Sequence, residues 1–179
     1  MMEDLSLHIL DIAENAVEAK ARRVDIRVEE RRSKDRLILQ VTDDGRGMGP
    51  RRLARARDPF YTTKKVRRIG LGLPLLAQAA ESAGGALALR SEPGHGTKVR
   101  ATFKLGHIDR QPLGDMAETL VALLVGHQGI EFNYTHVTDT GRYVFRSRDA
   151  AAFGPSGAPA VSGIRKKIRD GLARLRRTS

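Results

Sequence analysis

The chain has 179 residues, enough for one substantial hydrophobic core and a small appendage but not for two large domains. It contains no cysteine, which excludes a disulfide scaffold, a thiolate-ligated zinc site and a thiol nucleophile. Aromatic residues make up only 4% and Trp is absent, which argues against a stacking platform for single-stranded nucleic acid. The sequence shows no apolar stretch that could span a bilayer and no signal-peptide pattern, so we expect a cytoplasmic protein.

The net charge of +11 is concentrated in two basic blocks. Residues 51–68 contain eight Lys or Arg against one acid, and residues 161–179 contain seven against one acid. A basic block beside a glycine-rich loop can serve a bound polyphosphate as well as nucleic acid or anionic lipid.

The first predicted element is an amphipathic helix over residues 6–20, where apolar residues recur at helical spacing. Asp11 and Asn15 are four residues apart and therefore project from one face of this helix. A carboxylate that accepts a proton from water, one turn from an amide oxygen that can ligate a divalent cation, suits ATP hydrolysis or phosphoryl transfer. The alternative is that both residues belong to a solvated helix face.

Two strands are predicted next, at residues 24–28 and 37–41, joined as a hairpin by a polar turn. The second strand runs into a glycine turn that contains Asp43, Gly45, Gly47 and Met48. Asp43 is fixed at the strand end, where its carboxylate can accept a hydrogen bond from an exocyclic amine such as that of adenine, and the glycines let a flat ligand approach. The alternative is an ordinary turn that closes a strand.

A long basic loop, or a loop with a short helix, follows Met48 and has the character of a lid. It ends in the run Gly70-Leu71-Gly72-Leu73, which leads directly into a helix stopped by Gly84-Gly85. Glycines before a helix leave backbone N–H groups free to face phosphate oxygens. Strands at residues 86–91 and 97–103 complete this part of the chain.

In the order and spacing of four motifs, residues 6–105 resemble the ATP-binding domain shared by histidine kinases, gyrase-type topoisomerases, mismatch-repair ATPases and heat-shock chaperones. The resemblance implies a Mg²⁺ ligand at Asn15, adenine contacts at Asp43 and Gly47, a phosphate-binding glycine motif and a supporting threonine at Thr97. The ATP-binding set that it implies is Asn15, Asp43, Gly45, Gly47, Met48, Lys64, Gly70, Leu71, Gly72, Leu73 and Thr97. The implied cofactors are ATP and Mg²⁺.

The histidine-kinase branch is the nearer one, because the run from Asp58 to Lys64 resembles the kinase lid motif. The resemblance implies a two-layer α/β sandwich, an α+β fold with a mixed, largely antiparallel sheet and helices on one face. Asp11 stands where mismatch-repair ATPases have a glutamate as general base. A complete histidine kinase carries its phospho-acceptor histidine in a preceding helical hairpin, and the resemblance here begins with the first residues. We therefore expect a stand-alone member without that hairpin.

Beyond residue 105 the sequence predicts a small α+β extension over residues 106–149, formed by one helix and one β-hairpin. Residues 150–163 are rich in Ala, Gly, Pro and Ser and are typical of a linker. Residues 164–179 form a basic amphipathic helix, which could dock on a partner, on the same chain or on an acidic surface, or remain a solvated tail. Residues 1–105 are expected to be the ATP-binding domain.

The sequence thus predicts a Mg-dependent ATP-binding protein of bacterial signalling or regulation, which hydrolyses ATP or transfers its γ-phosphate to an unidentified partner protein. The alternative is a nucleotide-responsive switch that binds ATP or ADP with little turnover. A homodimer is left open. A basic nucleic-acid-binding protein is the least favoured hypothesis.

Overall fold

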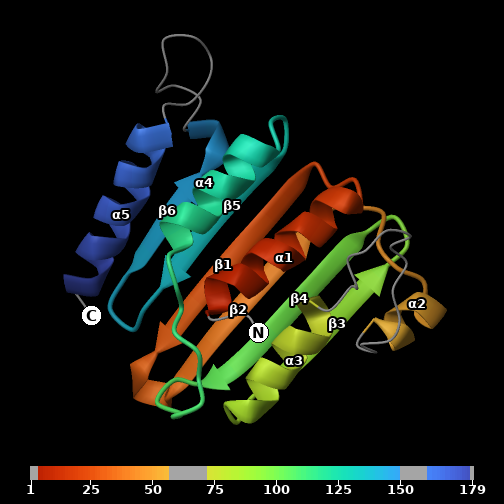
Figure 1. Ribbon diagram of the computed structural model, residues 1–179, viewed down its shortest axis with the longest axis horizontal. Coiled ribbons are helices and arrows are strands. Elements are labelled where there is room, and N and C mark those ends of the chain that lie inside the picture. Colours follow the sequence, from red (N-terminus) through yellow and green to blue (C-terminus); the bar gives the residue numbers. More distant parts are fainter. Residues whose placement is uncertain (1–3, 57–71, 150–160, 178–179) are drawn as a thin grey trace.

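The computed structural model describes residues 4–56, 72–149 and 161–177 (Figure 1). In chain order the elements are α1 (Leu5–Glu18), β1 (Arg23–Arg31), β2 (Arg36–Asp43), α2 (Pro50–Arg55), α3 (Gly72–Ser82), β3 (Ala86–Glu92), β4 (Gly96–Lys104), α4 (Met116–Gly126), β5 (Glu131–Val137), β6 (Arg142–Arg146) and α5 (Val161–Arg177). Short 3-10 turns follow β1 at Arg32–Lys34 and β6 at Ser147–Asp149.

The strands form one six-stranded sheet in the order β3-β4-β2-β1-β5-β6. Neighbouring strands are antiparallel except for β1 and β5, which run parallel. Two antiparallel strands can be joined by a tight turn, whereas a parallel pair needs a crossover. Helix α4 lies in the connection from β4 to β5, on the face of the sheet that also carries α1, α3 and α5 (Figure 1). The predicted mixed, largely antiparallel sheet with helices on one face is confirmed.

Strand β1 alternates in burial because one face of the sheet packs under the helices and the other does not, whereas β2 has Leu37, Ile38 and Leu39 buried in succession. In β1, Val24, Ile26 and Val28 are buried, while Asp25 and the other intervening residues are charged and only partly buried. The same period of two that predicted β1 from the sequence therefore decides which of its side chains enter the core.

The extension after β4 belongs to the same sheet and the same core as the preceding residues. Strand β5 pairs with β1 along seven residues, from Arg23 opposite Glu131 to Glu29 opposite Val137. One hydrophobic cluster unites Ile9 of α1 and Val24 of β1 with Leu120, Phe132 and Ile168 from the extension and α5. The helix and hairpin expected after residue 105 are thus α4 and β5–β6, and they extend the sheet beyond β1.

Helix α5 docks on the chain itself, packing against α4 and β6. Its apolar side chains Ile164, Ile168 and Leu175 are buried, as the amphipathic pattern requires. The helix begins at Val161, so residues 161–163, which were expected in the linker, are helical. The remainder of the expected linker, residues 150–160, lies outside the described residues.

Candidate functional site

Four segments that carry predicted site residues meet at one end of the sheet. The carboxyl end of α1, the end of β2 and the start of β4 lie toward the upper right of Figure 1, and α3 begins at Gly72 against Asp11 of α1. Asp43 is paired with Thr97 across the β2–β4 ladder. Arg46, in the turn after β2, donates its backbone N–H to the carbonyl oxygen of Ala19 at the end of α1 at 2.8 Å. The turn is therefore held against the helix that carries Asn15.

Asp43 has its carboxylate half-buried at the end of β2. Its Oδ1 accepts a hydrogen bond from the backbone N–H of Gly45 at 2.8 Å. Burial raises the pKa of Asp43, and the negative charge of Asp44 adds to this, although the N–H groups of Gly45 and Thr97 oppose it. Because the fold disfavours the charged carboxylate without a further partner, a donor such as an exocyclic amine would relieve that cost.

The neighbouring acid, Asp44, has a structural role. Its Oδ1 accepts the backbone N–H groups of Arg22 and Arg23 at 2.8 and 2.9 Å, which fixes the entry into β1. Partial burial alone would raise the pKa of Asp44, but these N–H groups outweigh it and lower the pKa. Asp44 therefore stabilises the backbone at the start of β1, whereas Asp43 remains available to a ligand.

Two glycines of this corner are required by close backbone packing. Gly47 has φ +67°, and a Cβ there would overlap the carbonyl oxygen of Glu92. Gly96 has φ +79°, and a Cβ there would overlap the carbonyl oxygen of Asp43. Both positions need the left-handed region and leave no room for a side chain. The turn after β2 and the β3–β4 turn are therefore packed directly on each other.

Ser91, at the end of β3, joins these two turns through its hydroxyl. Its Oγ accepts the backbone N–H of Met48 at 2.8 Å and donates to the carbonyl oxygen of Gly96 at 2.8 Å. It also lies 2.9 Å from the hydroxyl of Thr97. Ser91 thus holds two of the predicted site residues, Met48 and Thr97, in fixed relation.

Asp11 on α1 faces the first residue of α3. A Cβ on Gly72 would overlap Oδ2 of Asp11, so the carboxylate lies directly against the helix start. Helices α1 and α3 pack against each other, which holds this contact. Asn15 lies one turn further along the same face of α1. A carboxylate, an amide and the positive end of a helix therefore converge on this region.

The donor set suits Mg²⁺ held jointly by protein and phosphate. Asn15 and Asp11 offer hard oxygen atoms, the ligands that Mg²⁺ prefers. Among the described residues there is no group of three or more His, Asp or Glu that could hold a metal ion by itself. Mg²⁺ commonly takes one or two protein oxygens and completes its shell with phosphate oxygens and water. The residues present fit that mode, in which Asn15 would be the protein ligand.

Some of the predicted site falls outside the described residues. Lys64, Gly70 and Leu71 belong to residues 57–71, so the lid and the first half of the glycine motif stay predictions. Of the glycine motif, Gly72 is buried and Leu73 packs against the hydrophobic core.

Sequence reasoning missed Ser91 and the separate role of Asp44. The only signal for Ser91 was its place opposite Thr97 in the β3–β4 hairpin, a pairing that depends on the register of the two strands. The hydrogen-bond partners of Asp44 lie 21 and 22 residues earlier in the chain, so no local sequence pattern could predict them.

The geometry brings predicted site residues of α1, β2, α3 and β4 close to one another on a mixed sheet, and the comparisons with known proteins identify the family. The family described as histidine kinase-, DNA gyrase B-, and HSP90-like ATPase matches residues 3–107. This is more than half of the chain. The chain therefore belongs to this family and carries an ATP-binding domain of the histidine-kinase type.

Several curated relatives are sensor kinases. The sensor histidine kinase ZraS of Salmonella typhimurium is 38% identical over 89 residues, which are 49% of this chain and 19% of the relative. The sensor protein kinase FleS of Pseudomonas aeruginosa is 40% identical over 110 residues, 62% of this chain and 27% of the relative. The chain thus spans about a quarter or less of the length of these relatives.

Among solved structures, the N-terminal domain of a DNA repair protein is similar with a TM-score of 0.55 and 14% identity. The match covers 80% of this chain and 52% of that one, and at this identity it shows the fold alone. No helix among residues 4–56, 72–149 and 161–177 is long and apolar enough to cross a membrane.

Proposed function

We propose that the protein binds ATP with Mg²⁺ at the corner between α1, β2 and α3, and hydrolyses it or transfers its γ-phosphate to a partner protein in bacterial signalling. The observation that carries the proposal is the contact of Asp11 with Gly72 at the start of α3, with Asn15 one turn away. It joins a proton acceptor, a Mg²⁺ ligand and a helix start that can receive phosphate oxygens.

In this proposal Asp43 reads the adenine by accepting a hydrogen bond from its exocyclic amine. Gly45 and Gly47 allow the base to approach the backbone, and Met48 lies beside it. Thr97, held by Ser91, supports the carboxylate of Asp43 through its backbone N–H. The raised pKa of Asp43 favours this role, because a buried carboxylate without a full set of donors gains most from a ligand that supplies one.

At the phosphate end, Asn15 would hold the metal, which neutralises the charge of the phosphates when bound. Gly70, Leu71, Gly72 and Leu73 would present backbone N–H groups to the phosphate oxygens, and Lys64 would add a positive charge. Asp11 would accept the proton of the attacking water or hydroxyl. Phosphoryl transfer depends mainly on such positioning and charge neutralisation.

The experiment is a calorimetric titration of the purified protein with ATP and Mg²⁺, followed by a phosphate-release assay on the same samples. We expect Asp43→Asn to lose nucleotide affinity and Asn15→Ala to lose turnover. Asp11→Asn should bind nucleotide but turn it over at least tenfold more slowly, because general bases contribute about 10²–10⁴ in rate. The matched control is Glu14→Gln, next to Asn15 on α1, whose carboxylate pairs with His127 at 2.8 Å.

A wild-type protein that binds no nucleotide would refute the proposal. Binding without any measurable turnover, in the presence and absence of candidate partners, would instead favour a nucleotide-responsive switch. This second function is kept because Asp11 is shorter than the glutamate that it replaces in the mismatch-repair ATPases.

A further inference from the structure

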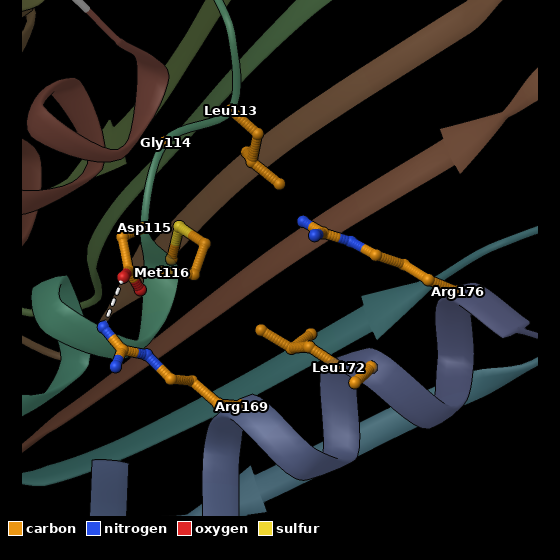
Figure 2. A pocket seen from close by; sticks show the side chains of 8 residues that line it. Leu113, Gly114, Asp115, Met116, Arg169, Leu172 and Arg176 are labelled. Atoms are coloured by element: carbon orange, nitrogen blue, oxygen red, sulfur yellow. Dashed lines mark hydrogen bonds and ion pairs between the residues drawn. The ribbon is translucent and has the colours of Figure 1, made fainter. Parts of the chain in front are cut away.

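A pocket of about 370 Å³ lies between the loop that precedes α4 and the outer turns of α5 (Figure 2). It is separate from the nucleotide corner, since none of its lining residues belongs to α1, β2 or α3. Its volume is at the small end of the range for ligand sites, about 300–1,000 Å³. Leu113, Met116 and Leu172 give it an apolar wall, and Arg169 and Arg176 stand at its rim.

The two arginines of the rim differ in their hydrogen-bond and ion-pair partners. Arg169 donates to Oδ2 of Asp115 and to Oε1 of Glu118, both at 2.8 Å, so its charge is already paired. Arg176 makes no hydrogen bond or ion pair with any residue that the structure describes, and its side chain reaches across the pocket toward Leu113 (Figure 2).

The charge of Arg176 also acts on the carboxylate of Glu30, which already has a hydrogen-bond partner. Oε1 of Glu30 lies 2.8 Å from Nε2 of His136. That hydrogen bond is the main reason why the pKa of Glu30 is lowered, and the charge of Arg176 contributes less. The planar donors of the Arg176 guanidinium are therefore available to a ligand.

The walls of the pocket are held in place from both sides. On the loop side, the backbone N–H of Leu5 donates to the carbonyl oxygen of Pro112 at 2.9 Å. Gly114 has φ +81°, and a Cβ there would lie 2.6 Å from Oγ of Ser6, so the loop fits tightly against the start of α1. On the helix side, Arg165 of α5 donates to both oxygens of Glu118 at 2.6 and 3.1 Å. The pocket is thus formed before any ligand arrives.

We propose that this pocket binds a small organic anion, with a compact apolar body against Leu113, Met116 and Leu172 and a carboxylate or phosphate group on Arg176. The guanidinium fork matches the paired oxygens of either group. A cation is disfavoured, because the one carboxylate that lines the pocket, Asp115, is occupied by Arg169 and by the backbone N–H groups of Ala117 and Glu118.

The test is a titration of the nucleotide-free full chain with benzoate, phenyl phosphate, inorganic phosphate and benzyl alcohol. Calorimetry measures the affinity, and NMR of the backbone amides locates the bound ligand. We expect benzoate or phenyl phosphate to bind and to shift amides of residues 113–116 and 169–176. The preferred head group identifies the class of anion. Inorganic phosphate lacks the apolar body and benzyl alcohol lacks the anionic group, so each should bind at least about tenfold more weakly.

Two variants and one control decide the outcome. Arg176→Gln should weaken binding about tenfold or more, and Ala173→Leu should abolish it by filling the pocket. Arg177→Gln, an exposed neighbour on α5 outside the pocket, should bind as the wild type does. Equal losses in Arg176→Gln and Arg177→Gln would mean general electrostatic attraction and overturn the proposal. Failure of both aromatic anions to bind the wild type would also overturn it, whatever the nucleotide site does.

Discussion

The two adjacent acids after β2 should respond in opposite ways to the same isosteric change. Asp43→Asn should reduce nucleotide affinity without reducing the stability of the free protein. Asp44→Asn should reduce stability and leave affinity nearly unchanged. The reason is that Asp43 is half-buried and faces the proposed adenine site, while Asp44 holds the backbone of Arg22 and Arg23.

The magnitudes follow from the contacts. A hydrogen bond to a charged group contributes about 1.5–3 kcal/mol, so loss of the Asp43 charge should weaken ATP binding about 10-fold to 150-fold. In the free protein Asp43→Asn should be neutral or stabilising, because burial disfavours the carboxylate and an asparagine oxygen can still accept the N–H of Gly45. In Asp44→Asn two hydrogen bonds lose charge assistance at an exposed site, which should cost about 1 kcal/mol.

The assay combines calorimetric ATP titration with thermal unfolding of the nucleotide-free protein. For a domain of this size 1 kcal/mol corresponds to about 2–4 °C in Tm. We expect that decrease for Asp44→Asn and no decrease for Asp43→Asn. ATP affinity of Asp44→Asn should stay within about threefold of the wild type.

The reasoning would be refuted if Asp43→Asn lowered Tm by several degrees while ATP affinity stayed unchanged. Asp43 would then be a structural acid, as in an ordinary strand-closing turn. A large loss of affinity in Asp44→Asn with unchanged Tm would exchange the two roles.

Four further predictions concern the site and α5. As the pH falls, nucleotide affinity should begin to decrease at a higher pH than the ordinary pKa of an aspartate would predict, because the pKa of Asp43 is raised and its carboxylate is protonated earlier. In a calorimetric pH series, Asp43→Asn should not show this decrease. Ser91→Ala should lower the free energy of unfolding by about 1–3 kcal/mol in urea, since it leaves partly buried groups unpaired, and a loss below 0.3 kcal/mol would contradict its role. Gly72→Ala should displace the carboxylate of Asp11 and reduce phosphate release more than ATP affinity, whereas equal losses would point to the helix start alone. Gly171→Ala should loosen α5 because its Cβ would overlap the ring of Tyr143, so proteolysis of α5 should accelerate although alanine favours helices; the exposed Gly163→Ala should do the reverse.

The sequence was sufficient for the elements whose residues alternate or recur at a fixed period. The alternation of Val24, Ile26 and Val28 with charged residues predicted β1, and the same pattern decides which side chains enter the core. The place of Asp43 at a strand end was also predictable, because a buried apolar run followed by glycines allows few other conformations. Local patterns of this kind need no knowledge of distant residues.

Features that depend on distant pairing could not be predicted in the same way. The hairpin β5–β6 was expected, but its parallel pairing with β1 arises from a crossover through α4, and no local pattern in residues 131–137 specifies a partner strand. The apolar stripe of α5 predicted an amphipathic helix without its docking surface, because Ile164 and Ile168 would suit any apolar groove. The contact of Asp11 with Gly72 depends on how α1 and α3 pack.

The pairing of β1 with β5 also has a consequence for biosynthesis. The partner of β1 on that side lies about a hundred residues further along the chain, and ribosomes add about 5–20 residues per second. After residue 105 has been made, β5 is completed 32 residues later, about 2–6 s at these rates. During that interval one edge of β1 lacks its strand, and an open edge invites pairing with other chains. The charged residues Asp25, Arg27 and Glu29 on β1 disfavour pairing of this temporarily open edge with other chains.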